Sequence, residues 1–260
     1  MRDFREIRYE ESGGLATVTL NRPERLNALG MNLAEEFCAL AEELAGADDV
    51  RVVVLTGEGR AFTTGRDLKE SASHTKEEAD RFLRFGMAGV NLWERLPMPT
   101  IAAINGHCFG WGTEVALCCD IRLAAEEATI CLPECSLGIF PGAGGAPRLP
   151  RLLSVGLAKE LIYTSKRIDG REAERIGLAN RAHPAEKLME EALAVAAQIR
   201  DNGPLGVRAA KRVIGHTLEM PIPQAIEFSK AIRLPLNDTK DFAEALAAFK
   251  EKRKPVFRGE

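Results

Sequence analysis

The spacing of hydrophobic residues changes several times along the chain, and each spacing predicts a different element. Residues 5–20 alternate between polar and apolar and then become mainly apolar, which predicts a strand. From residue 27 onward, apolar side chains recur with helical spacing, which predicts a helix with one buried face. Residues 50–55 form an apolar run that predicts a buried strand, and a short second strand is expected at 61–64.

The pattern of a buried strand, a turn and a short second strand recurs at residues 101–109 and again at 121–132. Such repetition predicts a coiled ladder of similar units rather than a doubly wound nucleotide-binding fold. A further helix is predicted over residues 76–96, where a proline then stops it. The preceding segment, 66–76, is polar and lacks a clear period, which predicts a mobile loop.

Toward its C-terminus the chain changes from strands and turns to helices alone. A helix is predicted at 151–163, and a capped helix that leads back to a strand is predicted at 168–180. Four later segments each carry one apolar stripe: 188–199, 207–214, 223–233 and 239–251. This shift predicts a core over residues 1–195 and a helical subdomain over residues 196–260.

The composition is that of an ordinary globular protein, with 45% hydrophobic and 28% charged residues among 260. A net charge of −3 provides no electrostatic footprint for nucleic acid. The charged N-terminus is unlike a signal peptide, and no apolar run approaches the ~18 residues of a membrane helix. The six cysteines form no zinc or disulfide pattern, so we expect reduced thiols and a cytoplasmic protein. The four histidines lack metal-ligand spacing, so no metal site is expected.

Two acidic residues occupy positions that suit catalysis. Glu114 follows the turn Gly110-Trp111-Gly112 and opens an apolar run, which predicts that it lies in the first turn of a helix. Glu134 follows Pro133 and precedes a second glycine-rich turn at 142–147, where we expect the backbone to approach a substrate. Two such carboxylates that converge on one pocket can hold a water molecule and divide acid and base roles.

The residues around these acids carry a family resemblance. Residues 105–120 have the form NG-x-x-x-G-x-G-x-E-x-A-x-x-CD, and residues 133–152 the form PE-x-x-LGI-x-PGAGG-x-x-RLPRL. Three further segments agree: LNRPERLNAL at 20–29, VVVLTGEGRAFTTGRDLKE at 52–70 and AFKEKRKPVF at 248–257. Together they resemble the enoyl-CoA hydratase/isomerase (crotonase) superfamily, in order, over nearly the whole chain. The resemblance implies an α/β fold, a crotonase-like spiral of repeated ββα units whose C-terminal helical subdomain mediates assembly into trimers or dimers of trimers.

The same resemblance implies roles for the site residues. An acyl-CoA thioester is the implied substrate, and coenzyme A is part of it, so no separate cofactor is expected. Glu114 and Glu134 hold and activate the water in this scheme, and Glu134 delivers a proton to Cα. The backbone amides of Thr64 and Trp111 form the oxyanion hole. The family has a glycine where Trp111 stands, so we expect the indole to narrow or shape the acyl site.

Several basic or aromatic residues are candidates for binding coenzyme A. Arg22 and Arg25 lie in the turn after the first strand and suit its phosphates. Arg66 stands where the family usually has a small residue, and its guanidinium suits a phosphate or the adenine, or else pairs with a surface acid. Phe249 and Lys252 match tail positions that, in the family, reach coenzyme A across a subunit boundary.

The presence of both acids favours hydration over the other chemistries of the family. An enzyme with only the second acid suits double-bond isomerisation, which shuttles one proton between two carbons. Hydrolysis of a thioester or of a β-dicarbonyl C–C bond needs the same oxyanion hole and stays open. A role in RNA binding or scaffolding requires a basic helix face, whereas the first long helix is acidic, with Glu35, Glu36, Glu42 and Glu43.

Overall fold

The first two strands form a hairpin. The computed structural model describes residues 3–260, and in it β1 (Ile7–Ser12) pairs with β2 (Leu15–Leu20) in antiparallel register. The prediction of one strand over residues 5–20 is therefore wrong. Gly13 and Gly14 both have positive φ, at 58° and 82°, and glycine adopts this conformation without steric cost. These two glycines turn the chain back on itself.

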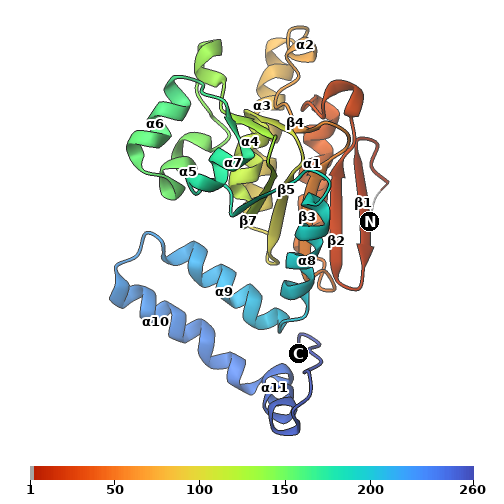
Figure 1. Cartoon of the computed structure of the whole chain (residues 1–260), viewed down its shortest axis with the longest axis vertical. Helices are drawn as coiled ribbons and strands as arrows, with labels where there is room; N and C mark the ends of the chain where they lie inside the picture. The colour runs from red at the N-terminus through yellow and green to blue at the C-terminus, as the bar shows by residue number, and fades with distance from the viewer. Residues whose placement is uncertain (1–2) are drawn as a thin grey trace.

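A six-stranded sheet forms the centre of the body (Figure 1), and within residues 3–260 its strand order is β1-β2-β3-β5-β7-β10. The strands that continue it after the hairpin are β3 (Val52–Gly57), β5 (Thr100–Ile104), β7 (Ile121–Ala125) and β10 (Arg181–His183). From β2 onward all neighbours are parallel. Parallel strands are usually buried on both faces, and β3 and β5 are buried at every residue.

A second sheet collects the short return strands. Its members are β4 (Ala61–Thr63), β6 (His107–Phe109), β8 (Thr129–Cys131) and β9 (Ile168–Asp169). Successive strands alternate between the two sheets: in each of the pairs β3–β4, β5–β6 and β7–β8, the first strand lies in the six-stranded sheet and the second in the smaller sheet. The predicted repetition of similar units is confirmed. Because β4, β6 and β8 are parallel, their carboxyl ends meet at one edge of this sheet.

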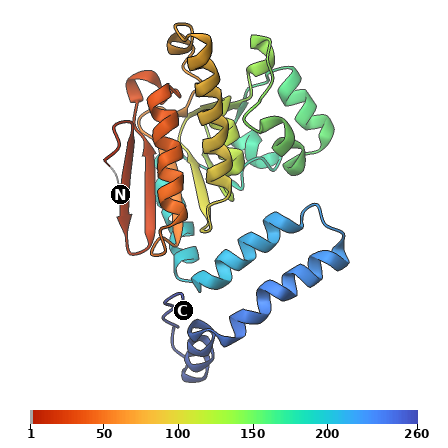
Figure 2. The same ribbon diagram turned by 180° about the vertical axis from the view of Figure 1, so that it is seen from behind.

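Two long helices, α1 (Met31–Ala45) and α3 (Lys76–Glu94), lie side by side behind the sheet (Figure 2). Phe37 of α1 stacks on Trp93 of α3, with ring centroids 4.8 Å apart. A capping box between Thr75 and Glu78 starts α3. The segment predicted to be a mobile loop contains the short helix α2 (Leu68–Ser71).

Helix α4 (Trp111–Cys118) is buried at every residue, and the body has several further helical segments. They are the 3-10 turns η1 (Pro23–Arg25) and η2 (Glu134–Leu137) and the helices α5 (Gly145–Leu152), α6 (Val155–Tyr163), α7 (Gly170–Arg175) and α8 (Leu188–Arg200). The helix predicted at 151–163 is in fact the end of α5 and all of α6, because Leu153 and Ser154 interrupt it.

The C-terminal helices extend away from the body (Figures 1 and 2). They are α9 (Pro204–Thr217), α10 (Ile222–Arg233), the 3-10 turn η3 (Leu234–Asp238) and α11 (Lys240–Glu251). The expected boundary after residue 195 lies inside α8, which packs on the central sheet. The division into two domains and the oligomerisation role of residues 196–260 remain predictions. No helix among residues 3–260 is long and apolar enough to cross a membrane.

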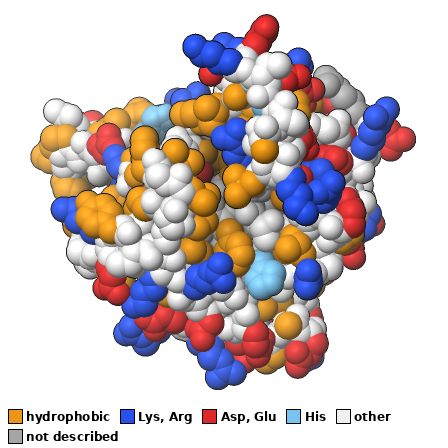
Figure 3. All heavy atoms as spheres, turned by 90° about the horizontal axis from the view of Figure 1, so that it is seen from above, with side chains coloured by type: hydrophobic (Ala, Val, Ile, Leu, Met, Phe, Trp, Pro, Cys, Tyr) orange, Lys and Arg blue, Asp and Glu red, His pale blue; other side chains and the backbone are white. Residues whose placement is uncertain are grey.

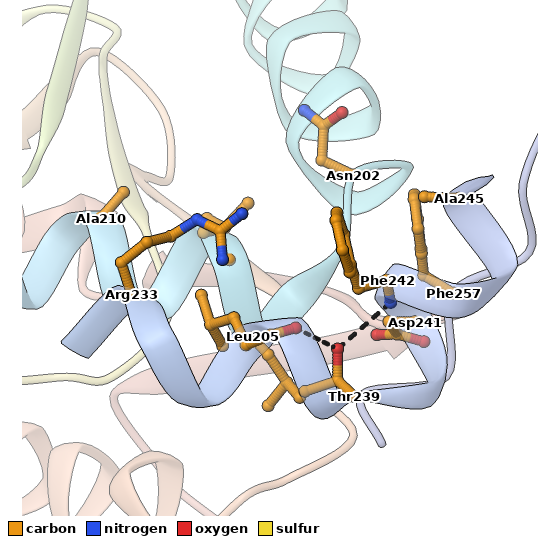
Figure 4. Close-up of a pocket in the computed structure, with 13 residues that line it drawn as sticks. Asn202, Leu205, Ala210, Arg233, Thr239, Asp241, Phe242, Ala245 and Phe257 are labelled. Atoms are coloured by element: carbon orange, nitrogen blue, oxygen red, sulfur yellow. Dashed lines mark hydrogen bonds between the residues drawn. The ribbon is translucent and has the colours of Figure 1, made fainter. Parts of the chain in front are cut away.

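A cavity of about 420 Å³ lies among these C-terminal helices. Figure 4 shows side chains from the α8–α9 junction, α10 and α11 lining it, among them Leu205, Arg233 and Phe242. None of the predicted site residues contributes to its lining. The candidate chemistry is therefore built elsewhere, at the edge of the second sheet.

Candidate active site

The carboxyl ends of β4, β6 and β8 bring together three segments that are distant in sequence. Thr63 pairs with Cys108, and Phe109 pairs with Cys131, so the residues that follow these strands are neighbours. The amide of Gly110 donates to the carbonyl of Cys131 at 2.9 Å. The segments that begin at Thr64, Gly110 and Leu132 therefore surround one region, which contains both predicted acids.

Both acids lie at the start of α4. A Cβ placed on Gly110, the residue at the helix N-cap, would lie 2.9 Å from Oε1 of Glu134. Gly110 has a positive φ of 53°, so glycine is favoured here both by backbone conformation and by the adjacent carboxylate. Glu114 occupies the first turn of α4 and is only 3% exposed. The prediction that Glu114 is in the first turn of a helix is confirmed, and the two carboxylates approach the same helix end.

Glu114 is held by a backbone amide of another helix. Gly145, the first residue of α5, donates its N–H to Oε1 of Glu114 at 2.8 Å. Burial raises the pKa of Glu114 to about 7, and the nearby charge of Glu134 adds to the increase. The hydrogen bond from Gly145 opposes this increase because it stabilises the charged form. A carboxyl group that titrates near neutral pH is suited to proton transfer.

Glu134 has a different environment. It begins η2, and burial raises the pKa of its carboxyl group as well. Its Oε2 is buried and accepts no hydrogen bond from any group within residues 3–260. Buried carboxylate oxygens normally have a donor, so this oxygen is suited to accept from a small polar group such as water. The two acids thus differ: one is fixed by a backbone donor and the other has an unused oxygen.

The raised pKa of Glu114 predicts a pH-dependent stability. The folded protein binds this proton more tightly than an exposed carboxyl group with a pKa of 4.5, so stability falls as pH rises from about 4.5 through about 7. Glu114→Gln keeps an oxygen for the Gly145 amide but carries no charge. The free energy of unfolding of the variant is expected to exceed that of wild type by about 2 kcal/mol near pH 8. Near pH 5 the two free energies of unfolding are expected to be similar. Urea unfolding at both pH values measures this, and parallel pH profiles would contradict it.

The amide of Thr64 is not available for an oxyanion hole. It donates to the carbonyl of Leu26 at 3.2 Å, so the prediction for Thr64 is wrong. Two residues later the situation differs, because Leu29 pairs with Gly65 and Asp67 on either side of Arg66. Because of this pairing, the N–H of Arg66 points away from Leu29. The Arg66 amide has no acceptor in the described part of the chain.

Trp111 supplies a second unpaired amide. It is the first residue of α4, and the first N–H groups of a helix have no intrahelical acceptor. A Cβ on Gly65 would lie 3.2 Å from the Trp111 nitrogen and 2.6 Å from the Phe109 oxygen. The absence of a side chain at Gly65 therefore keeps the approach to this amide open.

The indole of Trp111 lies in the core rather than at the acyl site. It is 6% exposed and meets the ring of Phe37 edge-on, with centroids 5.1 Å apart. Its Nε1–H donates to the carbonyl of Gly86 in α3 at 3.0 Å. The ring thus ties the start of α4 to α1 and α3. The expectation that it narrows or shapes the acyl site is wrong, because the core already surrounds it.

Arg22 has a structural role. Its guanidinium lies 3.1 Å from Glu6, 3.6 Å from Asp67 and 3.8 Å from Glu70, and only 13% of the side chain is exposed. It also donates to the carbonyl of Ala28. With three acids around it, Arg22 is not available for a phosphate, so its assignment to coenzyme A is wrong.

Several contacts hold the segment after Arg66, and its mobility stays a prediction. Asp67 caps α2 by accepting from the amides of Lys69 and Glu70, and it lies beside Arg22. Arg66 itself donates from Nε to Ser71 and places its guanidinium 4.9 Å from the centroid of the Phe82 ring. Its two terminal nitrogens have no partner in the described structure, so phosphate binding by Arg66 remains a prediction.

The other candidates for coenzyme A are exposed. Arg25 ends η1 and has no ion-pair partner among the described residues. Phe249 is 84% exposed near the end of α11, and Lys252 follows as the helix C-cap. Within one chain these last two lie in the C-terminal extension, far from α4 (Figure 1). Their roles remain predictions that require a second subunit.

An apolar surface lies beside the acids. Seen from above, orange side chains gather on the side of α5 and α6 (Figure 3). Three of the exposed apolar residues lie within six residues after Glu134: Leu137, Ile139 and Phe140. No group of three or more His, Cys, Asp or Glu in residues 3–260 could hold a metal ion.

The ladder of paired strands divided between two sheets has the architecture of the crotonase class. The chain belongs to the enoyl-CoA hydratase/isomerase family, whose model matches residues 10–260. It is 37% identical over 256 residues to the short-chain-enoyl-CoA hydratase of Clostridium acetobutylicum, covering 97% of each. It is 38% identical over 258 residues to human mitochondrial methylglutaconyl-CoA hydratase, covering 96% of this chain and 76% of the relative.

A solved structure agrees with the fold. The crystal structure of enoyl-CoA hydratase from Bacillus anthracis superimposes with a TM-score of 0.96 at 41% identity, covering 98% of this chain and all of the other. The family resemblance and the crotonase-like α/β fold predicted from the sequence are confirmed.

Two contributors to the site are not evident from local sequence patterns. The glycine-rich turn at 142–147 contacts Glu114 through the Gly145 amide, and its approach to a substrate stays a prediction. The Arg66 amide is free only because Leu29 pairs with Gly65 and Asp67 on either side of it. The signal for α2 was present in the sequence: Asp67 followed three residues later by Glu70 is typical of a helix start.

Proposed function

We propose that this protein is an enoyl-CoA hydratase, which adds water across the 2,3 double bond of a 2-enoyl-CoA thioester. The observation that carries the proposal is the pair of carboxylates at the start of α4: Glu114 is buried and fixed by Gly145, and Glu134 is half-buried with a buried, unpaired oxygen. Membership of a family that acts on acyl-CoA thioesters supplies the substrate class. Hydration requires two acid–base groups that act on one water molecule, and this site offers two carboxyl groups.

Hydration places negative charge on the thioester oxygen as the water oxygen bonds to Cβ. Preorganised backbone amides stabilise such an oxyanion without bringing a side-chain charge. We assign this role to the amides of Trp111 and Arg66, because both lack an acceptor in the described residues and Gly65 between them has no side chain. The start of α4 contributes its positive end to the same region.

The two acids then act on the same water molecule in different roles. Glu114, fixed by the Gly145 amide, accepts a hydrogen bond from the water and orients it toward Cβ. Glu134, through its unpaired oxygen, relays a proton to Cα. The hydroxyl group at Cβ and the hydrogen at Cα together account for one water, so both carboxyl groups end the cycle in their starting protonation states.

A spectrophotometric assay with crotonyl-CoA tests the proposal. The enoyl absorbance is expected to fall without any added cofactor, and mass spectrometry is expected to show a product heavier by one water. If the absorbance is stable for 2-enoyl-CoA substrates of every chain length, and a 3-enoyl-CoA is converted instead, the protein is an isomerase. Release of free coenzyme A would identify a hydrolase.

We further propose that Arg25 binds a phosphate of coenzyme A and that Arg22 does not. Arg25→Gln is expected to raise KM for crotonyl-CoA by about 3- to 10-fold with kcat unchanged, because it removes binding that is equal in the ground and transition states. Arg22→Gln is expected to lower the free energy of unfolding by about 2 kcal/mol, because Glu6, Asp67 and Glu70 lose their counter-ion. Steady-state kinetics and urea unfolding separate the two. An unchanged KM in Arg25→Gln would remove it from the site.

A further inference from the structure

The loop Ala143–Gly145 is held from two sides. On one side, the amide of Gly145 donates to Oε1 of Glu114 at 2.8 Å. On the other side, Nη1 of Arg148 donates to the carbonyl of Ala143 at 3.2 Å. The guanidinium also occupies the space that a side chain at Gly144 would fill, since a Cβ there would lie 1.5 Å from Nη1. The loop backbone therefore lies between a guanidinium and a carboxylate.

Arg148 is itself fixed by α3. Its Nε and Nη2 donate to the two oxygens of Glu94 at 2.8 and 2.7 Å, and Nη2 also donates to Asn91 at 3.0 Å. A bidentate arginine–carboxylate pair defines the plane of the guanidinium as well as its position. The Arg148 side chain is 15% exposed, so solvent screens the pair only in part. Helix α3 therefore fixes the position of the Arg148 guanidinium, which contacts the loop.

The loop needs such a restraint because of its composition. Gly144 has a φ of 116°, and a Cβ on Gly145 would lie 2.9 Å from Cβ of Pro141 and 3.1 Å from Cγ of Glu114. Glycines allow this close approach but also allow many other conformations. The contacts made by Arg148 and Glu114 favour the conformation in which the Gly145 amide meets the carboxylate.

We infer that Arg148 is a positioning residue, which holds the Ala143–Gly145 loop so that the Gly145 amide fixes the carboxylate of Glu114. The inference rests on the proposed function insofar as Glu114 is taken to act on the water. Arg148 acts through the loop and makes no contact with the reacting atoms.

The charged and titratable groups around Glu114 come from four elements. Glu134 approaches from η2, Arg148 from α5 and Cys118 from α4 itself, while Glu94 of α3 lies behind Arg148. The amides of Gly145 and Ala143 and the charge of Arg148 all lower the pKa of Glu114. If the loop geometry is lost, the two amides no longer lower the pKa of Glu114. If the arginine charge is lost, its lowering effect on this pKa is lost as well.

Two substitutions separate geometry from charge. Arg148→Met removes both, whereas Arg148→Lys keeps the charge but cannot pair with both oxygens of Glu94 and reach Ala143 as well. For both variants we expect kcat for crotonyl-CoA to fall by roughly 10- to 100-fold. The acidic limb of the kcat profile is expected to move upward by roughly one pH unit, because the charged form of Glu114 loses a hydrogen bond.

Arg151→Met is the matched control. Arg151 lies on the same helix, pairs with Glu219 just after α9, donates to the carbonyl of Pro147 and makes no contact with residues 143–145. This variant is expected to keep the wild-type kcat and pH profile. Circular dichroism and thermal unfolding of all variants establish that each is folded under the assay conditions.

A readout that does not depend on activity completes the test. In protein labelled with 13C at the glutamate carboxyl carbons, the signal missing from Glu114→Gln identifies Glu114, and its titration midpoint is expected to rise in both Arg148 variants. A rise in a protein that does not hydrate crotonyl-CoA would leave the positioning role standing and overturn the proposed function. A wild-type midpoint and kcat in Arg148→Lys, with only Arg148→Met altered, would reduce the role to charge and overturn the inference.

Discussion

Glu134→Gln is expected to lower kcat for hydration of crotonyl-CoA by roughly a thousandfold while KM stays near that of wild type. Glutamine retains the shape of the side chain and an oxygen that accepts a hydrogen bond. It cannot carry a proton from water to Cα at neutral pH, so the loss falls on the chemical step. Initial rates followed by enoyl absorbance over a range of substrate concentrations give both constants.

Glu127→Gln is a suitable control for this prediction. Glu127 is exposed in the turn between β7 and β8 and is expected to behave as wild type. Glu114→Gln is also expected to lose activity, and the double variant with Glu134→Gln is expected to be little worse than either single variant, because the two acids act on one water. A Glu134→Gln enzyme that retains more than about a tenth of the wild-type kcat would contradict the role of this residue.

Trp111→Ala is expected to lower the free energy of unfolding by about 4 kcal/mol. The indole is buried against Phe37, and its removal leaves a cavity between α1, α3 and α4. The carbonyl of Gly86 also loses its donor. Urea unfolding measures the effect, and the amide of residue 111 is still present in the variant.

Trp111→Phe is the companion variant. It keeps an aromatic ring against Phe37 but lacks the Nε1–H, so its cost is expected to be smaller, at about 2 kcal/mol. The preference for acyl-chain length is expected to be the same in wild type and both variants, because the ring does not line the acyl site. If Trp111→Ala has wild-type stability but an altered preference for acyl-chain length, the indole lines the acyl site and this prediction is wrong.

Much of the fold could be predicted from local patterns. The apolar stripe of α1, with Leu33, Phe37 and Leu40 fully buried, follows directly from helical spacing. The repeated strand–turn–strand units were visible because each buried strand is a continuous apolar run. The prediction of one strand over residues 5–20 fails because residues 10–14, EESGG, contain no apolar residue and include a Gly-Gly pair that favours a hairpin turn. The four residues of α2 are too few to show a helical period, so only the Asp67 cap signals this helix in the sequence.

The sequence by itself determined the family, the repeated strand–turn–strand units and the first-turn position of Glu114, because these depend on residue types at short spacings. The tertiary structure decided which backbone groups are free and which side chains are neutralised. Thr64 loses its amide to Leu26, 38 positions away, and Arg22 is surrounded by three acids from two separate segments. Such pairings form only when distant segments pack together. Hydrogen bonds and ion pairs between them leave no trace in local periodicity, so the contacts that tune this site could be found only in the folded chain.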